Sequence, residues 1–325
     1  MASGSNSAIM PGSWRRGFRR HGPRFAPPLS LRRHFDAPPR VTRSTSKDAL
    51  LSPAQIENWR RAHNGVMDQN HRIQNFLCDM DGVLINDGSI VEGADQFLER
   101  LRSTDRGFLV LTNNSLFTPG ELRVQLTSMG LEVEESQLWT SALATAQFVN
   151  TQRPRGTAFV IGQESLHLAL ADVGYREDST SPDYVVLGET WEYSYDDFAK
   201  AIRFINGGSH FVSTNPEPTG PAREGSLPGC GAMAALIESA TGVTPYVVGK
   251  PNSMMLREGM NVLRASTHST VMIGDRMETD VLAGVDAGLS TILVLSGAND
   301  ERDASRFPFR PSRVVDSVAE LIREL

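Results

Sequence analysis

Short runs of β-forming residues alternate with amphipathic stretches from residue 73 to the end of the chain. This alternation is typical of βαβ units, in which each helix connects two parallel strands. The apolar runs predict strands at 73–79, 107–112, 158–162, 184–187, 210–213, 246–248, 270–274 and 291–295. The stretches between them predict helices at 93–102, 119–129, 138–151, 165–172, 195–206, 231–241, 253–263, 278–287 and 317–324. We therefore expect an α/β protein with a doubly wound, mainly parallel sheet.

Composition limits the class of protein further. Of the 325 residues, 40% are hydrophobic and 22% are charged, which is the balance of a water-soluble globular protein and excludes a fibrous or wholly disordered chain. No apolar run approaches the ~20 residues that a membrane-spanning helix needs. The two cysteines, Cys78 and Cys230, cannot form a disulfide framework, so a reducing compartment and a cytoplasmic location are expected.

The first 66 residues are predicted to form a disordered basic arm. Residues 1–50 carry ten Lys and Arg against two Asp and Glu, whereas the remaining chain carries 22 against 36. Three interpretations of the arm stay open: an organellar transit peptide, a segment that binds nucleic acid or an anionic surface, and an extension upstream of a later start at Met67. The acidic balance after residue 50 argues against nucleic acid as a partner of the folded part.

Two aspartates end the first predicted strand, in the run NFLCDMDGV at 75–83. The carboxyl ends of parallel strands form the sites of open α/β sheets. Because side chains alternate along a strand, Asp79 and Asp81 can lie on one side, and Gly82 permits a sharp exit. One carboxylate can attack phosphorus while the other transfers the proton of the leaving group. Taken alone, the same pattern also fits a strand-end turn or a helix cap.

Polar residues follow three other predicted strands. Thr112 and Asn113 offer a hydroxyl and backbone N–H groups that could bind phosphate oxygens. Lys250 could neutralise phosphate beside the carboxylates, and Asp275 and Asp280 form a second acidic cluster at the start of a helix. Each group has an ordinary alternative, namely a turn that caps a helix, a solvated lysine and a helix-dipole interaction. Their recurrence at four strand ends favours one shared site.

Together these motifs resemble the haloacid dehalogenase-like hydrolase superfamily. In order they are Asp79-x-Asp81-Gly, Thr112-Asn113-Asn114, Gly249-Lys250-Pro251 and Gly274-Asp275-x4-Asp280. The segments Ser213-Thr214-Asn215-Pro216 and Gly229-Cys230-Gly231 are more closely similar to its subclass IIA, the NagD-type phosphatases. The similarity spans about residues 73–323. It implies a Rossmann-like catalytic core at 67–149 and 236–325, and an inserted α/β cap at 150–235 that closes over the site and selects the substrate.

The resemblance also implies the chemistry of the motifs. Asp79 would be the nucleophile that forms an aspartyl-phosphate, and Asp81 would protonate the leaving alcohol and then activate water. Thr112, Asn113 and Lys250 would bind the phosphoryl oxygens.

A divalent metal is part of the same expectation. The Asp79 carboxylate, the Asp81 backbone carbonyl and Asp275 would hold Mg²⁺, while Asp280 orients the water shell of the metal or Lys250. The residue types agree, because hard oxygen donors suit Mg²⁺ whereas Zn²⁺ would favour His or Cys.

The function implied is a Mg²⁺-dependent phosphomonoester hydrolase that acts on nucleoside monophosphates such as UMP. Sugar phosphate, phosphoglycolate, pyridoxal phosphate and 4-nitrophenyl phosphate remain alternatives within the subclass. Asn215 and Glu217 are the candidates for substrate choice, although related proteins more often carry Asp where this chain has Glu217, and a solvated loop charge is the ordinary alternative. An interpretation of another class is a catalytically idle phosphoester-binding or interaction protein that uses the basic arm. A homo-oligomer is possible, and no membrane partner is expected.

Overall fold

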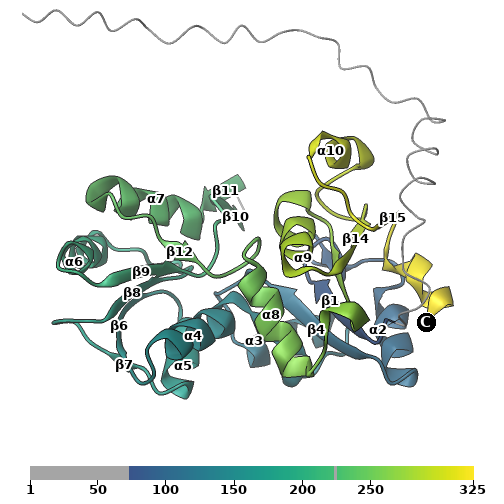
Figure 1. The fold of residues 1–325 in the computed structure, drawn as a ribbon, viewed down its shortest axis with the longest axis horizontal. Coiled ribbons are helices and arrows are strands. Elements are labelled where there is room, and N and C mark those ends of the chain that lie inside the picture. The colour runs from purple at the N-terminus through teal and green to yellow at the C-terminus, as the bar shows by residue number, and fades with distance from the viewer. Residues whose placement is uncertain (1–72, 223–224) are drawn as a thin grey trace, which may run out of the picture. The chain divides into compact units, whose positions relative to one another are not determined.

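The computed structural model describes residues 73–222 and 225–325, so the predicted basic arm at 1–66 lies outside the described residues. Two parallel sheets with helices packed against them make up most of this part of the chain (Figure 1). The α/β class with mainly parallel sheets is therefore confirmed.

The first sheet has six strands, and all neighbouring strands run parallel. From edge to edge they are β15 (Arg313–Val315), β14 (Ser290–Val294), β13 (Thr270–Gly274), β1 (Asn75–Asp79), β4 (Gly107–Thr112) and β5 (Leu138–Thr140). The central strand β1 is buried on both faces, with Phe76 and Cys78 in one apolar cluster and Leu77 in another. A strand covered on both faces reads as a continuous apolar run, which is why its sequence shows no polar alternation.

Helices supply the rest of both clusters. α2 (Ala94–Ser103), α3 (Pro119–Met129) and the short helix η4 (Val318–Glu324) pack in the cluster of Phe76. α8 (Ser253–Leu263) and α9 (Leu282–Ala287) pack in the cluster of Leu77. Because α2 and α3 follow one face and α8 and α9 the other, the sheet is doubly wound.

The second sheet has five parallel strands. Their order is β12 (Tyr246–Val247), β9 (His210–Ser213), β8 (Tyr184–Leu187), β6 (Thr157–Ile161) and β7 (Arg176–Glu177). α6 (Tyr195–Asn206) and α7 (Cys230–Thr241) pack in a cluster with Phe159 and Val185. α4 (Ser141–Gln152) and α5 (Glu164–Asp172) join the cluster of Leu77, which also holds Val186. This cluster is thus an apolar core shared by the two sheets.

The remaining described elements are short. They are the antiparallel pairs β2 (Ile85–Asn86) with β3 (Ser89–Ile90) and β10 (Thr219–Ala222) with β11 (Gly225–Pro228), the turns η1 (Glu135–Gln137), η2 (Thr267–Ser269) and η3 (Met277–Val281), and α10 (Glu301–Arg306). No helix among the described residues has the length and apolar character needed to cross a membrane.

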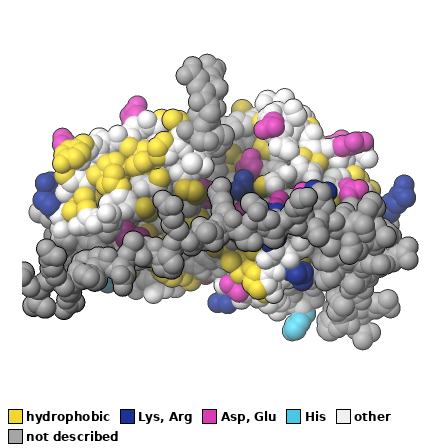
Figure 2. All heavy atoms as spheres, turned by 90° about the horizontal axis from the view of Figure 1, so that it is seen from above, with side chains coloured by type: hydrophobic (Ala, Val, Ile, Leu, Met, Phe, Trp, Pro, Cys, Tyr) yellow, Lys and Arg dark blue, Asp and Glu magenta, His cyan; other side chains and the backbone are white. Residues whose placement is uncertain are grey.

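One part of the surface is apolar. Leu236 of α7 is 45% exposed and Leu227 of β11 is 47% exposed, and α7 contacts β11. Figure 2 shows hydrophobic side chains gathered on its left, the side on which α7 lies in Figure 1. Nothing in the described residues covers them.

The sequence predicts the longer elements well and the short ones poorly. Four strands have the expected bounds, at 107–112, 184–187, 210–213 and 270–274. The helix expected over 138–151 is wrong at its start, because Leu138–Thr140 pair with β4 as an edge strand and the Thr140 side chain then caps α4 by accepting from the N–H of Leu143. The helix expected at 278–287 opens as a π-helical turn. The sequence predicts none of β7, β15 and α10, which are too short for a measurable apolar period.

Candidate active site

Three neighbouring strands of the first sheet end at one place. β1 lies between β4 and β13, and their carboxyl ends carry Asp79, Thr112 and, one residue after β13, Asp275. All three side chains are buried. The parallel register therefore brings residues that are far apart in the sequence to one edge of the sheet.

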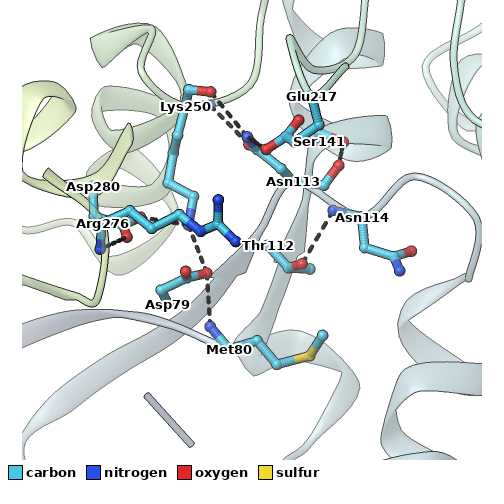
Figure 3. Close-up of polar contacts among 10 residues, drawn as sticks. All are labelled: Asp79, Met80, Thr112, Asn113, Asn114, Ser141, Glu217, Lys250, Arg276 and Asp280. Carbon is cyan, nitrogen blue, oxygen red and sulfur yellow. Dashed lines mark hydrogen bonds and ion pairs between the residues drawn. The ribbon is translucent and has the colours of Figure 1, made fainter. Parts of the chain in front are cut away.

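Lys250 lies between two buried carboxylates at this edge. Its Nζ is 2.6 Å from Oδ1 of Asp79 and 2.8 Å from Oδ1 of Asp280 (Figure 3). The backbone N–H of Met80 also donates to Oδ1 of Asp79, at 2.8 Å. The ion pair and the hydrogen bond thus hold the same oxygen of Asp79 and leave Oδ2 outside both contacts.

The lysine reaches this position from the second sheet. β12 pairs with β9, and the N–H groups of Val248 and Gly249 donate to the carbonyls of Ser213 and Thr214. A Cβ at Gly249 would collide with the Thr214 carbonyl and the Asn113 side chain, so only glycine fits this approach. The backbone therefore remains hydrogen-bonded to the second sheet as far as Gly249. The end of the cap was expected earlier, at residue 235. That boundary falls inside α7, which continues to Thr241.

Burial and crowding of like charges shift the pKa values of these groups. Burial, and then the charge of Asp280, raises the pKa of the Asp79 carboxyl well above its ordinary range, and Lys250 opposes the shift. Burial and Asp280 also raise the pKa of Asp275 to about 6. Burial lowers the pKa of Lys250, but Asp280 and Asp79 outweigh it and the net direction is upward. Such crowded carboxylates favour the binding of a further cation.

The donor atoms fit a divalent cation. Carboxylate oxygens of Asp79, Asp275 and Asp280 lie within 4.8 Å of one another. Asp280 is already engaged, because Lys250 approaches Oδ1 and the N–H of Arg276 donates to Oδ2 at 3.1 Å. Asp275 accepts from the N–H of Ala298 on Oδ2, whereas its Oδ1 is buried without a hydrogen-bond partner among the described residues. An orphaned anionic oxygen beside a second carboxylate suits a hard metal ion such as Mg²⁺.

Asp81 lies where the chain leaves β1, and its side chain is exposed. Desolvation by the surrounding protein raises the pKa of its carboxyl, while Lys250 and Arg276 lower it. The next residue, Gly82, has a φ of 78°, and a Cβ there would collide with the Asp275 carboxylate. The sharp glycine turn thus keeps Asp81 near the buried carboxylates and on the side open to solvent.

The side chain of Asn113 joins the two sheets. Its Nδ2 donates to Oε1 of Glu217 at 2.6 Å and to the carbonyl of Lys250 at 2.9 Å, and its Oδ1 accepts from the N–H of Lys250 at 2.8 Å (Figure 3). Its carbonyl accepts from Nδ2 of Asn215 at 2.9 Å. Next to it, the Thr112 hydroxyl accepts from the N–H of Asn114 at 3.1 Å. The structure therefore brings all of the expected phosphate-binding and substrate-selecting residues together.

The sequence does not single out several residues that contribute to this site. Ser115 donates to Oε2 of Glu189 through its N–H and its hydroxyl, at 2.9 and 3.1 Å, and forms a second junction between the sheets. The hydroxyl of Ser141 donates to the carbonyl of Asn113 at 2.6 Å. The side chain of Arg276 points toward Thr112 in Figure 3. Of these, Ser115 directly follows the Thr112-Asn113-Asn114 motif and Arg276 stands within the second acidic motif, so these two had a sequence signal.

Two family models match the chain. A haloacid dehalogenase-like hydrolase model matches residues 76–176, and a HAD-hydrolase-like model matches residues 247–321. The two matches together contain the Asp79, Thr112, Lys250 and Asp275 segments and cover more than half of the chain.

Individual proteins are similar over most of the described residues. The chain is 49% identical over 246 residues to the dihydroxyacetone phosphatase of Corynebacterium glutamicum. The aligned region covers 76% of this chain and 90% of that protein. The chain is 40% identical to the ribonucleotide monophosphatase NagD of Escherichia coli, whose solved structure has a TM-score of 0.73 and covers 77% of this chain and 98% of that one. A solved 4-nitrophenylphosphatase from Thermotoga maritima is 32% identical, also has a TM-score of 0.73, and covers 77% of this chain and 97% of that one.

Proposed function

The chain belongs to the haloacid dehalogenase-like hydrolases, and from this premise we propose that it is a Mg²⁺-dependent phosphomonoester hydrolase that works through an aspartyl-phosphate. One observation carries the proposal most directly. The buried Asp79 is held on a single oxygen by Lys250 and by the N–H of Met80, so its second oxygen is available for attack beside the orphaned oxygen of Asp275. A positioned carboxylate of this kind can serve as a nucleophile.

In the first half of the reaction, Oδ2 of Asp79 attacks phosphorus and the bond between phosphorus and the ester oxygen breaks. Asp81 gives its proton to the departing oxygen, so the alcohol leaves neutral. The raised pKa of Asp81 supports this role, because the group is then more often protonated near neutral pH. The exposed position of Asp81 also suits a group that must contact a leaving group entering from solvent.

In the second half, Asp81 acts as a base and takes a proton from water. The water oxygen attacks phosphorus, the bond between phosphorus and Asp79 breaks, and inorganic phosphate is released. Asp81 is then protonated again and ready for the next ester. The same residue thus serves as acid and base, and no further co-reactant is required.

Three groups are proposed to bind the phosphoryl oxygens: the hydroxyl of Thr112, the backbone N–H of Asn113 and the ammonium of Lys250. The Asp79 carboxylate, the Asp81 carbonyl and Asp275 are proposed to hold Mg²⁺. When bound, the metal screens the negative charges of nucleophile and phosphate from each other. Asp280 is proposed as a positioning residue, because both of its oxygens are engaged by Lys250 and Arg276.

Two kinds of substrate are proposed. Nucleoside monophosphates such as UMP are the first, supported by the name of the Escherichia coli relative. A triose phosphate such as dihydroxyacetone phosphate is the second, supported by the name of the 49%-identical relative. In either case the second sheet and its helices are proposed as the substrate-selecting cap, with Asn215 and Glu217 at its contact with the catalytic residues.

The experiment is a phosphate-release screen of the full chain over nucleotides, sugar and triose phosphates, pyridoxal phosphate, phosphoglycolate and 4-nitrophenyl phosphate. We expect release with Mg²⁺, loss of release with a chelator, and a loss of at least about a thousandfold in Asp79→Asn. Asp87→Asn, at an exposed turn between β2 and β3, is the matched control and should retain activity. Turnover by Asp79→Asn at the wild-type rate would refute the mechanism, and release from no ester would favour the idle binding protein.

A further inference from the structure

The guanidinium of Arg276 is surrounded by acids but bonded to none of them. It makes no ion pair or hydrogen bond with any residue in the described parts of the chain. Its charge nevertheless acts on Asp81, Asp275 and Glu217, because it opposes the rise in pKa that burial causes in all three. The side chain is exposed and points into the site toward Thr112 (Figure 3). An unpaired guanidinium with five donors is therefore held close to where the phosphate ester would bind.

Glu217 has the complementary feature, a hydrogen-bond acceptor without a donor. Its Oε1 accepts from Asn113 at 2.6 Å, but its Oε2 is buried and has no hydrogen-bond partner among the described residues. A buried acceptor without a donor is costly, and such groups in native proteins usually bond to water or a ligand. The Asn113 hydrogen bond fixes the carboxylate beside the backbone of Lys250, so the free oxygen lies at the same site as Arg276.

We propose that Arg276 and Glu217 form the subsite for the leaving group and select esters whose leaving group carries both a hydroxyl and a carbonyl or second hydroxyl oxygen close to the phosphate. This inference rests on the proposed function. Glu217 accepts from the hydroxyl through Oε2, and Arg276 donates to the other oxygen.

The charges of the subsite exclude other kinds of leaving group. A hydrocarbon leaving group would bury the unpartnered Glu217 oxygen without giving it a donor. A leaving group with its own carboxylate, such as that of phosphoglycolate, would be attracted by Arg276 but repelled by Glu217, Asp81 and Asp275. A short, neutral and oxygenated leaving group satisfies both residues.

Three esters of the same length test the proposal. Dihydroxyacetone phosphate has the hydroxyl and the carbonyl, hydroxyacetone phosphate has only the carbonyl, and n-propyl phosphate has neither. The readout is the ratio of kcat/KM between two esters for the full chain with Mg²⁺, because a ratio cancels any general loss of activity.

The two residues should affect different ratios. Glu217→Met should lower the ratio of dihydroxyacetone phosphate to hydroxyacetone phosphate by about tenfold or more, because that pair differs in the hydroxyl. Arg276→Met should lower the ratio of hydroxyacetone phosphate to n-propyl phosphate by a similar factor, because that pair differs in the carbonyl. Glu217→Gln keeps an acceptor for Asn113 and should give the same direction with a smaller effect, so it covers the case in which Glu217→Met does not fold.

The outcomes separate this inference from the proposed function. If each variant lowers kcat/KM for all three esters by one common factor, the subsite is overturned while hydrolysis itself stands. If the wild-type chain releases phosphate neither from the three esters nor from any ester of the wider screen, the proposed function fails. Ratios that change selectively, as described, support both residues as specificity determinants.

Discussion

The carboxyl ends of the two parallel sheets differ in charge. The first sheet ends in the buried carboxylates Asp79 and Asp275, whereas β9 of the second sheet ends in Ser213 and runs into Thr214 and Asn215, which are buried and neutral. Both sheets are parallel and covered by helices, so the shared architecture alone does not make a catalytic site. The first sheet supplies the buried carboxylates, and the second supplies the Lys250 ammonium and the hydrogen bonds that hold them.

Lys250 shows how the two contributions depend on each other. The backbone before it is bonded to the second sheet through Val248 and Gly249, while its Nζ neutralises carboxylates of the first sheet. The second sheet thus positions a cation that neutralises carboxylates of the first. Variants at the connecting residues can test whether this division is real.

Of the changes predicted here, removal of the Lys250 charge should have the largest effect on stability and activity. Lys250→Met leaves Asp79 and Asp280 as buried charges without their partner, so we expect the free energy of unfolding to fall by ~3–5 kcal/mol. We also expect kcat for 4-nitrophenyl phosphate to fall by about a hundredfold or more. Urea unfolding and initial rates at pH 7 measure the two effects.

Lys200→Met is the matched control for that experiment. Lys200 forms an ion pair with Asp197 at 3.3 Å on α6, with both side chains partly exposed, so its loss should cost less than ~1 kcal/mol and leave kcat unchanged. If Lys250→Met were as mild as Lys200→Met, the two carboxylates would not depend on the lysine, and the division between the sheets would be wrong.

The sequence predicts the central strands better than the edges, for a physical reason. β1, β4 and β13 are buried on both faces and form apolar runs that are visible without knowledge of the fold. The edge strand β5 pairs with only one neighbour, and its Leu-Trp-Thr sequence fits the start of a helix equally well. Pairing with β4 decides between the two, and pairing is a tertiary contact that no local pattern contains.

The same distinction applies to the site. Asp79, Thr112 and Asp275 can be found from the sequence because each directly follows, or ends, an apolar strand. Glu189 cannot be found in this way, because its importance depends on its contact with Ser115. That residue is 74 positions away and follows a strand of the other sheet. Asn113 also follows an apolar strand and is found from the sequence, but its side-chain contacts with Lys250 span 137 residues and could not be predicted. The sequence thus indicates which residues lie at the strand ends, whereas the contacts that hold the two sheets together have no local signature.

Removal of the Asn113 side chain should have an intermediate effect on stability and activity. It tests how much the site depends on the hydrogen bonds that place Lys250. Asn113→Ala leaves both backbone groups of Lys250 and Oε1 of Glu217 without their partner. We expect a loss of about 1–3 kcal/mol in the free energy of unfolding and a fall in kcat of about tenfold, because Lys250 is less firmly placed. Urea unfolding and a Michaelis–Menten analysis measure both.

Asn252→Ala provides the control in the same turn. Asn252 donates to the carbonyl of Val247 at 2.7 Å and caps α8 by accepting from the N–H of Met254, but it does not contact the carboxylates in the described structure. It should lower stability by about 1 kcal/mol without a matching change in kcat. Equal losses of kcat in the two variants would show that Asn113 acts only through stability.

The smallest expected effect is a pH dependence of stability at the second junction between the sheets. Burial raises the pKa of Glu189, and the hydrogen bonds from Ser115 oppose the shift without cancelling it. The folded state therefore retains the proton at a pH where the unfolded chain has lost it. As pH rises from about the ordinary glutamate pKa of 4.3 through the raised value, Glu189 removes stability, and the loss is complete above the raised value.

Glu189→Gln removes this titration and retains an oxygen that can accept from Ser115. The free energy of unfolding, measured in urea at several pH values from 4 to 8, should therefore fall less steeply with pH in the variant. Other buried acids such as Asp79 titrate in both proteins, so only the difference between the two curves reports on Glu189. Glu132→Gln, at an exposed position, should give a curve parallel to the wild type. If Glu189→Gln is also parallel, the junction stabilises the contact between the sheets without any cost from a buried charge.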